Sequence, residues 1–530
     1  MDKKDMKTLK LFHRLVALIF VASLGACATA KFPDNTGRTD SYAFEDTQDT
    51  SLSRSYDSRS EGHIGESAYH YLSNGLDAFV ARAALADMAE RSIDTQYYMI
   101  HNDVVGSLFI DRLYKAAERG VRVRLLIDDI DQEGRDEGLA VLDAHPNIEV
   151  RLFNPFARNA GRTGQYISGF GKQTRRAHNK SFTVDNQITI LGGRNIGDEY
   201  FNADPKLAFI DIDVLSSGPV ARDVSASFDL YWNHELSYPI TTIAEKLPTE
   251  EESEQRKKAF FEFVAAQSET EYIQHLRDSD LAKSLRRDGL PAITWGIGDV
   301  VADDPDKLLE DTSDTKYRLI EQLRPYLGSV QKELIIFSPY FVPGKGGVAY
   351  FQSLRDQGVR VRILTNSLSS NDVSIVHAGY SRYRKALLRM GVELYELNKE
   401  LNKEERKKMK EGGIGRSKAS LHAKAFILDR DWVFIGSLNL DARSVVQNTE
   451  IGVMFQSPEI AKDLAGRFDS KIDRLAFRLE LIDGEKGQDQ IVWHGIVDDK
   501  QQTLYKEPYT GFWKRFGVGF MRILPIESQI

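Results

Sequence analysis

Two copies of one eight-residue pattern hold the residues of this sequence that are best suited to chemistry. Each copy reads His-x-Lys-x-x-x-x-Asp; the first begins at His178 and the second at His422. In an extended strand, residues two apart point to the same side, so each histidine shares a face with the lysine that follows it, Lys180 or Lys424. An imidazole beside an ammonium suits a phosphate ester, because the ring can attack or protonate the ester while the lysine neutralises its oxygens.

A glycine turn that ends in asparagine follows each copy. The first turn reads GGRN and ends at Asn195, and the second reads GSLN and ends at Asn439. One octapeptide of this kind can arise as a strand end with incidental polar residues. Two copies, each followed by the same type of glycine turn, argue against that interpretation and predict a duplicated functional site.

The pair of motifs resembles those of the phospholipase D superfamily, whose members carry two such motifs around one active site. The resemblance covers most of the chain after about residue 70 and is most marked to the cardiolipin synthase branch, especially its C-type, lipoprotein-like bacterial members. It rests on residues 94–98 (DTQYY), 175–180 (RRAHNK) and 437–441 (SLNLD). It implies an α/β fold of two homologous halves, each a mostly parallel sheet flanked by helices, packed around one central active site.

The resemblance also implies a role for each motif residue. His178 would attack phosphorus to form a phosphohistidine, and His422 would act as the general acid and base. The two motif lysines, with Asn195 and Asn439, would hold the phosphoryl oxygens. This chemistry requires no metal and no other cofactor, and the acidic run at residues 303–306 lacks the ligand spacing of a calcium loop.

An acidic residue follows each motif at a corresponding place in the repeat. These residues are Asp211 and Glu450. In the family an acid at this place bonds the histidine of the opposite half, so Glu450 would orient His178 and Asp211 would orient His422. Asp213, two residues after Asp211, is a competing candidate, and simple solvation of a strand end is the alternative for all three.

The aspartates that close the motifs, Asp185 and Asp429, are expected to have a structural role. Each lies seven residues after its histidine, which is roughly 23 Å along a straight strand. The neighbouring residues, Asn186 after one and Arg430 after the other, indicate a turn at the far end of a hairpin.

The elements that must position the motifs recur in the same order in both parts of the chain. A helix, a strand, a second helix and a second strand are expected over residues 81–90, 92–100, 106–119 and 120–128, and again over 317–327, 333–340, 348–357 and 358–366. The second strand of each set begins with GVRVR. Strands that alternate with helices predict α/β halves with largely parallel sheets. Packing one half against its copy would bring both motifs to a central seam.

These patterns divide the chain into six segments. We expect a signal peptide at 1–26, a flexible tether at 27–67, the two halves at 68–240 and 313–480, an insertion at 241–312, and a C-terminal extension at 481–530. Two long loops, at 154–177 and 396–417, precede the motifs and are expected to control access or specificity. A solvated surface loop is the alternative for the second, which is strongly charged.

The N-terminus has the features of a secretory signal. Basic residues precede a short apolar run at 15–24, and the segment LGAC, which ends at Cys27, resembles the lipobox of bacterial lipoproteins. Cys27 would then be lipidated, and the protein would be anchored on the periplasmic side of the cell envelope. Ala28 slightly favours the outer membrane by family analogy. A plain signal peptide or an uncleaved anchor remains the alternative.

The C-terminal segment 509–522 places aromatic residues beside basic ones. This mixture suits a membrane interface. A terminal helix packed on the domain fits equally well, and three glycines weaken the expectation of a long helix.

The resemblance, with the expected lipid anchor, favours an enzyme that acts on phospholipids. The net charge of −8 argues against a general binder of nucleic acids, and the single cysteine excludes an intramolecular disulfide. The resemblance implies a phosphatidyltransferase that forms cardiolipin at a membrane surface. Its phospholipid substrates would be phosphatidylglycerol, as acceptor, and either a second phosphatidylglycerol or another phospholipid as phosphatidyl donor. A phospholipase D hydrolase and a nuclease of the same superfamily are the alternatives. A non-catalytic module is disfavoured, because both His–Lys pairs are intact; the oligomeric state is left open.

Overall fold

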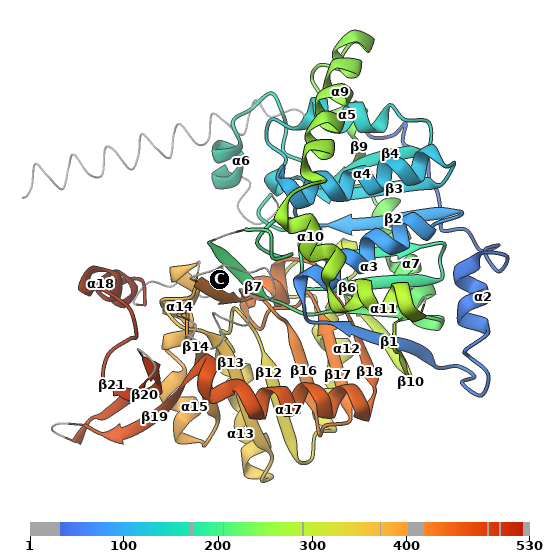
Figure 1. Cartoon of the computed structure of the whole chain (residues 1–530). Helices are drawn as coiled ribbons and strands as arrows, with labels where there is room; N and C mark the ends of the chain where they lie inside the picture. The colour runs from blue at the N-terminus through green and yellow to red at the C-terminus, as the bar shows by residue number, and fades with distance from the viewer. Residues whose placement is uncertain are drawn as a thin grey trace, which may run out of the picture.

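Two mixed β-sheets, one from each half, form the framework of the protein (Figure 1). The structure is a computed structural model that describes residues 32–168, 173–204, 206–288, 291–371, 373–400, 418–484, 487–497 and 500–522. The predicted signal peptide with Cys27, and most of the second long loop, lie outside these ranges. In Figure 1 the first half (blue to green) lies above the second (yellow to red).

The first half contains one sheet with the strand order β10-β1-β8-β6-β5-β2-β3-β4-β9. Its elements in chain order are β1 (Ser67–Leu72), α3 (Gly75–Met88), β2 (Ser92–Tyr97), α4 (Val104–Glu118), β3 (Arg122–Asp128), η1 (Asp129–Asp131), α5 (Asp136–Asp143), β4 (Ile148–Phe153), α6 (Arg162–Ser168), β5 (Ser181–Val184), β6 (Ile188–Gly192), β7 (Leu207–Ile210), β8 (Asp213–Ser217), α7 (Pro219–Trp232) and β9 (Ser237–Pro239).

The second half repeats this order as β11-β18-β17-β16-β12-β13-β14-β19, and β20 and β21 extend the sheet. Its elements are β11 (Gly298–Ala302), η2 (Pro305–Leu308), α12 (Leu319–Gly328), β12 (Glu333–Phe337), α13 (Gly344–Asp356), β13 (Arg360–Asn366), α14 (Ser374–Ser381), α15 (Arg384–Arg389), β14 (Glu393–Leu397), β15 (Lys418–Leu421), β16 (Ala425–Leu428), β17 (Trp432–Gly436), η3 (Arg443–Gln447), β18 (Ile451–Gln456), α17 (Pro458–Leu475), β19 (Ala476–Asp483), β20 (Asp489–Val497), β21 (Lys500–Leu504) and α18 (Phe512–Met521). Because β11 takes the place of β1, the structural repeat begins at residue 298, inside the predicted insertion.

The α/β class and the two homologous halves are confirmed, whereas the expectation of mostly parallel sheets is corrected. Parallel neighbours are β2, β3 and β4 in one sheet, and β12, β13 and β14 in the other. The strands that follow the motif lysines, β5 and β16, pair in antiparallel fashion with their neighbours on both sides. For one neighbour of each strand the reason is the length of the connection: β5–β6 and β16–β17 are hairpins with short turns, which can join only antiparallel strands.

A shared apolar core joins the two halves. Residues of β1, β6, β8 and α7 pack with residues of β12, β16, β17 and β18 in one cluster. Within it the ring of Tyr69 stacks on that of Phe455 with 4.2 Å between the centroids. The seam between the halves is therefore a packed interior, and the motifs at its edge have a rigid support.

Helix α17 is an amphipathic helix of the second half. Ser457 caps its first turn by accepting a hydrogen bond from Ile460, and Pro458 occupies the first helical position. Its buried residues recur at helical spacing along one side and face the sheet: Ile460, Ala461, Leu464, Ala465, Phe468 and Ile472.

Residues 32–66 lie on the first half, which corrects the expectation of a flexible tether for this part of the segment. The buried Arg124 donates to the carbonyl oxygen of Ser41 at 2.7 Å, and Arg151 donates to that of Thr39 at 2.6 Å. Helix α2 (Ser51–Asp57) follows and buries Leu52. A polar composition concealed this packing, because the segment contributes mainly backbone oxygens to buried arginines and few apolar side chains, such as Leu52.

The connection between the halves consists mainly of helices. Its elements are α8 (Ile240–Ile243), α9 (Glu250–Gln267), α10 (Glu271–Asp278), α11 (Asp280–Asp288) and β10 (Thr294–Gly296). Helices α9 and α11 pack against α4 and α3 of the first half. Across the parts of the chain that the structure describes, no helix is long and apolar enough to cross a membrane.

Candidate active site

A short strand that pairs across the seam positions His422. β15 lies directly before His422 and runs parallel to β7 of the first half, with Leu421 opposite Ile210. The backbone N–H of His422 donates to the carbonyl oxygen of Ile210 at 2.8 Å. Because Asp211 follows Ile210 in the chain, this register brings its carboxylate to the His422 ring.

His178 is positioned in the reciprocal way. Ala177 forms a parallel β-bridge with Thr449 of the second half. The backbone N–H of His178 donates to the carbonyl oxygen of Thr449 at 2.8 Å. Glu450 is the next residue, and its side chain therefore lies beside the His178 ring.

Each histidine ring is hydrogen-bonded to the acid of the opposite half. Nδ1 of His178 lies 2.8 Å from Oε2 of Glu450, and Nδ1 of His422 lies 2.6 Å from Oδ2 of Asp211. Both acids are buried. This is the cross-half pairing that the resemblance implied. A carboxylate on Nδ1 holds the proton there and leaves Nε2 as the reactive nitrogen.

Asp213, the competing candidate, has a different set of partners. Its Oδ2 lies 2.9 Å from Nη2 of Arg82 and 3.2 Å from Nη1 of Arg194. All three side chains are buried. Asp213 is therefore the anion of a buried ion-pair cluster at the start of β8, and it does not serve a histidine.

The two motif lysines are buried at the same place as the histidines. Nζ of Lys180 donates to the carbonyl oxygen of His178 at 2.6 Å, and Nζ of Lys424 donates to that of His422 at 2.6 Å. Nζ of Lys424 also lies 2.9 Å from Nδ1 of His422. Burial holds the pKa of Lys180 well below its ordinary value, although Glu450 opposes this change. Two lysine side chains are thus concentrated where a phosphate would be bound, and the negative charge of a bound phosphate would favour their cationic form.

The electrostatic environments of the two histidines differ. Burial, with the charges of Lys180 and Lys424, holds the pKa of His178 well below its ordinary value. The pKa of His422 is also lowered by burial and by Lys424, but Asp211 opposes that change. His178 therefore favours the neutral ring that a nucleophile needs.

The pKa values of the two acids are shifted in opposite directions. Burial raises the pKa of Glu450 to about 7, against the opposing charge of Lys180. Burial also acts on Asp211, but His422 and Lys424 outweigh it and hold the pKa of Asp211 below its ordinary value. Asp211 is thus an ionised partner, which favours His422 as the ring that carries a proton.

Asn195 and Asn439 are buried near the histidines with unused hydrogen-bonding capacity. Nδ2 of Asn195 donates to the hydroxyl of Tyr200 at 2.9 Å. The Oδ1 atoms of both asparagines are buried and have no hydrogen-bond partner among the described residues. An amide oxygen accepts hydrogen bonds and cannot bond to a phosphate oxygen, so contact with a phosphate would have to come from the Nδ2 groups of these residues. On that basis both residues remain candidates.

Aromatic rings beside the histidines were not predicted from the sequence. The ring of Tyr98 meets that of His178 edge-on at 4.8 Å, and the ring of Tyr200 meets that of His422 at 5.1 Å. Phe209 also lies 5.1 Å from His422. The sequence did contain a signal for Tyr98. It is the last residue of the DTQYY segment and directly follows β2. These contacts restrict rotation of the rings and fix the direction of Nε2.

Asp185 and Asp429 close the hairpins that carry the motifs. Asp185 accepts hydrogen bonds from the backbone N–H groups of residues 90, 91 and 92, at 3.1, 2.7 and 2.9 Å. Asp429 accepts from those of residues 331, 332 and 333, at 2.9, 2.7 and 2.8 Å. Both have positive φ angles, 52° and 53°, as a tight turn requires. Each carboxylate ties a hairpin turn to the start of a central strand.

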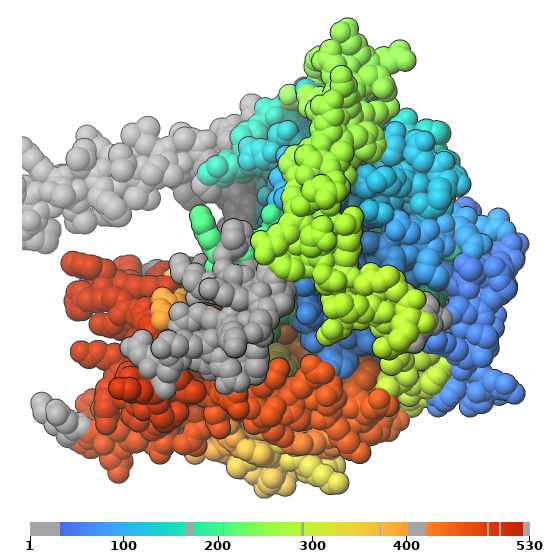
Figure 2. All heavy atoms as spheres, viewed as in Figure 1, coloured from blue at the N-terminus to red at the C-terminus, as the bar shows by residue number. Residues whose placement is uncertain are grey.

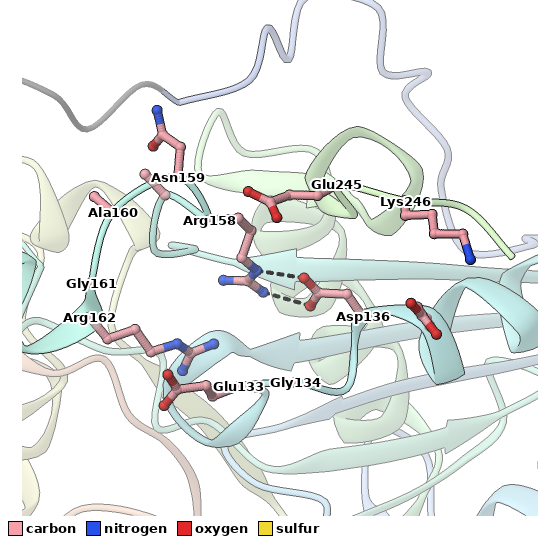
Figure 3. Close-up of a pocket in the computed structure, with 12 residues that line it drawn as sticks. Glu133, Gly134, Asp136, Arg158, Asn159, Ala160, Gly161, Arg162, Glu245 and Lys246 are labelled. Carbon is pink, nitrogen blue, oxygen red and sulfur yellow. Dashed lines mark hydrogen bonds and ion pairs between the residues drawn. The ribbon is translucent and has the colours of Figure 1, made fainter.

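A polar pocket of about 650 Å³ lies beside the segment that precedes His178 (Figure 3). Its lining contains neither His–Lys pair. Figure 3 shows Arg158 pointing at Asp136, and the same guanidinium also pairs with Asp129, at 2.6 Å to each carboxylate. The charge of Arg158 is therefore already neutralised within the protein, and we assign this pocket no chemical role.

One group of side chains in the described ranges has metal-ligand geometry: His101, Asp103 and Glu199. It includes none of the motif residues. It is partly exposed, and exposed acidic groups of this kind are common without an ion.

Comparisons with known proteins agree with this geometry. A family model described as "Cardiolipin synthase, PLD-like domain" matches residues 83–232 and 323–472. Cardiolipin synthase C of Escherichia coli (strain K12) is 42% identical over 466 residues, which are 88% of this chain and 96% of that protein. An uncharacterised protein of Helicobacter pylori (strain ATCC 700392 / 26695) is 33% identical over 91% of this chain and 93% of that protein.

Among solved structures, the phosphatidylserine synthase of Haemophilus influenzae Rd KW20 has a similar fold. The TM-score is 0.50 and the identity is 14%, with 78% of this chain and 87% of that chain covered. At this identity the likeness concerns the fold alone.

Proposed function

This chain belongs to the cardiolipin synthase family of phospholipase D-like proteins, and from that membership we propose that it is a phosphatidyltransferase that forms cardiolipin. The observation that carries the proposal is the pair of cross-half contacts, His178 with Glu450 and His422 with Asp211. They complete one two-histidine site within a chain that is 42% identical to cardiolipin synthase C of Escherichia coli.

The first step is attack on a phospholipid phosphodiester. Nε2 of neutral His178 forms a bond to phosphorus, and the bond from phosphorus to the headgroup oxygen breaks. Protonated His422 gives its proton to that oxygen, which leaves as an alcohol. Glu450 accepts the hydrogen bond from Nδ1 of His178 and stabilises the positive charge that develops on the ring.

The second step transfers the phosphatidyl group to an acceptor alcohol. His422, now neutral, removes the proton of a phosphatidylglycerol hydroxyl. The resulting oxygen attacks phosphorus and breaks its bond to Nε2 of His178. The product is a new phosphodiester, cardiolipin, and both histidines return to their starting states.

In both steps, the two motif lysines would neutralise the negative charge on the phosphoryl oxygens. Lys180 and Lys424 are held on the two histidine carbonyls. The Nδ2 groups of Asn195 and Asn439 would donate neutral hydrogen bonds to the same phosphoryl oxygens, that of Asn195 in exchange for its bond to Tyr200. Because the groups are buried and preorganised, little reorganisation accompanies the change in charge.

The test is a product analysis with separately labelled phospholipids. The purified enzyme is incubated with vesicles that contain labelled phosphatidylglycerol, alone or with a second phospholipid, and the products are identified by mass spectrometry. We expect cardiolipin and the released headgroup alcohol, and no product with His178→Ala. Phosphatidic acid without cardiolipin would show a hydrolase instead. Failure to convert any phospholipid would reject the proposal.

We also propose that lipidation of Cys27 anchors the enzyme on the periplasmic side of the cell envelope. The support is the LGAC run, which follows a basic segment and a short apolar run. Metabolic labelling with a fatty acid should mark the wild-type protein and leave Cys27→Ser unmarked. Equal labelling of the two proteins would reject the assignment.

A further inference from the structure

Helix α18 presents an unusual concentration of exposed aromatic side chains. Phe512, Trp513, Phe516 and Phe520 are 64%, 78%, 60% and 60% exposed. Of the large hydrophobic residues in the described ranges that are exposed, four therefore fall within one ten-residue helix. Exposed apolar groups that gather in this way mark interaction sites, whereas scattered ones do not.

These four residues form one surface of the helix, called here the aromatic face. Phe512, Phe516 and Phe520 are spaced by four residues, which places them on one side of an α-helix, and Trp513 adjoins them. Three of the rings contact one another: the centroids of Phe512 and Phe516 are 6.1 Å apart, those of Trp513 and Phe512 are 5.3 Å apart, and those of Trp513 and Phe516 are 6.2 Å apart. The aromatic face thus consists of a cluster of three rings, with Phe520 one helical turn further along the same side.

The aromatic face is exposed although α18 is firmly attached. On the opposite side, Val518 is 7% exposed and packs with Leu368 and Ala378 of the second half. Just before the helix, Glu507 accepts a hydrogen bond from buried Arg384 at 2.6 Å. The exposure is therefore a property of a docked helix, and it reverses the orientation of α17, whose apolar side faces the sheet.

The charge around the aromatic face is positive. Residues 508–522 include Lys514, Arg515 and Arg522 and no acidic residue, in a chain whose net charge is −8. Lys399 lies close by, with its Nζ 5.4 Å from the centre of the Tyr509 ring. Phe and Trp beside Lys and Arg, without acidic residues, match the two layers of a bilayer surface, in which apolar chains lie beneath anionic headgroups.

The aromatic face is connected to the rim of the active site. Leu368, which packs beneath α18, lies in the loop after β13, two residues beyond Asn366, the last residue of that strand. The side chain of Asn366 bonds to both backbone groups of Leu421, at 2.9 Å each, directly before His422. In Figures 1 and 2, α18 stands at the left of the molecule, on the same side as α6 of the first half.

We propose that the aromatic face of α18 docks the enzyme on an anionic lipid bilayer, next to the site that takes its substrate from that bilayer. The position of the substrate rests on the proposed function, but the docking itself rests on the exposed rings and the charge. The rings enter the interfacial region, and the basic residues contact lipid phosphates. A second copy of the chain or a protein partner would lack the matched layers of apolar and anionic groups.

A fluorescent label tests the docking without any measurement of activity. The full chain with Cys27→Ser has no other cysteine, so Phe516→Cys provides one attachment point for a polarity-sensitive dye. The matched control is Ile64→Cys, which replaces a residue that is 99% exposed and follows α2. In Figure 1, α2 stands at the opposite side of the molecule from α18. Any contribution of the N-terminus is the same in both proteins.

The label at residue 516 should become buried when vesicles of phosphatidylcholine and phosphatidylglycerol are added. We expect a blue shift and quenching by brominated acyl chains at 516 and neither at 64, with a weaker response in high salt or without phosphatidylglycerol. A label at 516 that stays in water on bound vesicles would overturn the proposal. A blue shift at 516 that needs no vesicles and grows with protein concentration would also overturn it, in favour of self-association.

Substitution of the aromatic face separates docking from chemistry. With Phe512, Trp513, Phe516 and Phe520 all changed to Ser, turnover on vesicles should fall by about tenfold or more, while turnover of a monomeric short-chain phospholipid stays within about twofold. The control is Leu230→Ser with Ile297→Ser, which removes two other exposed apolar side chains. Equal losses on both substrates would mean a structural defect and would overturn the docking role. If no phospholipid is turned over, the proposed function fails, but the label experiment still decides on docking.

Discussion

Glu450 accepts a hydrogen bond from His178 across the boundary between the two halves, with 2.8 Å between Oε2 and Nδ1. The contact joins residues 272 positions apart in the chain. The reciprocal contact, His422 with Asp211, has the same topology. Because each histidine depends on an acid from the other half, neither half contains a complete catalytic pair.

Removal of either histidine should abolish turnover of natural lipid. His178→Ala and His422→Ala should each lower kcat by several orders of magnitude, and the double variant should lose little more, because residues that act as a unit are not additive. The measurement is kcat for cardiolipin formation. Substantial activity in either single variant would reject a shared site.

A substrate that needs no protonation of its leaving group should distinguish the two roles. With a nitrophenyl phosphodiester, His422→Ala should still form the phosphoryl-enzyme, and His178→Ala should not. The adduct should map to His178 in a peptide digest. An adduct on His422 would reverse the assignment and leave the reaction class intact.

Replacement of Glu450 by Gln should change the pH profile. Burial raises the pKa of Glu450 to about 7, so the carboxylate is lost as the pH falls below this value and His178 loses its charged acceptor. In the wild type, kcat/KM should therefore decline below about pH 7. Glu450→Gln cannot titrate, and its profile should be lower and without this acidic limb. An unchanged limb would exclude Glu450 as its origin.

The same variant should show the stability cost of the buried acid. The pKa of Glu450 in the folded protein is about 7, above the value of 4.5 for a solvated glutamate. The folded state therefore binds the proton more tightly, and this group lowers the free energy of unfolding as the pH rises through that interval. Glu450→Gln should thus gain in Tm relative to wild type at pH 8 and not at pH 4.

Replacement by Asn should mainly lower activity at Asp211 and mainly lower stability at Asp213. Asp211→Asn removes the ionised partner of His422 and should lower kcat by roughly a hundredfold or more, with little change in stability. Asp213→Asn leaves Arg82 and Arg194 without their shared anion and should lower the free energy of unfolding by about 3–5 kcal/mol. Its kcat per folded molecule should be retained. Paired denaturation and kinetic measurements check both, and a reversed pattern would exchange the two assignments.

The motif aspartates should matter for stability and not for chemistry. Asp185→Ala leaves three backbone N–H groups without an acceptor and should lower the free energy of unfolding by about 2–4 kcal/mol. Asp429→Ala should cost less, because its partners are nearer to solvent. Urea denaturation measures both effects. A large fall in kcat of folded Asp185→Ala would contradict a purely structural role.

The sequence by itself determined the chemical groups and their local geometry. The two-residue spacing of His178 and Lys180 predicts a shared direction in any extended segment, and the turn at Asp185 follows from Asp–Asn, which tolerates positive φ. Duplication of the pattern, with its glycine turn, was sufficient to predict two halves around one site. These features depend only on residues close together in the chain.

The tertiary structure alone decided which of two acids meets His422. Strand alternation predicts that Asp211 and Asp213 point the same way, but the chain changes sheets between them: β7 ends at Ile210, paired with β15, and β8 begins at Asp213 in the large sheet. The two carboxylates therefore diverge. The parallel-strand content of the sheets and the packing of residues 32–66 were decided in the same way. Each depends on hydrogen bonds between segments far apart in the chain, and the periodicity of the sequence does not reveal such contacts.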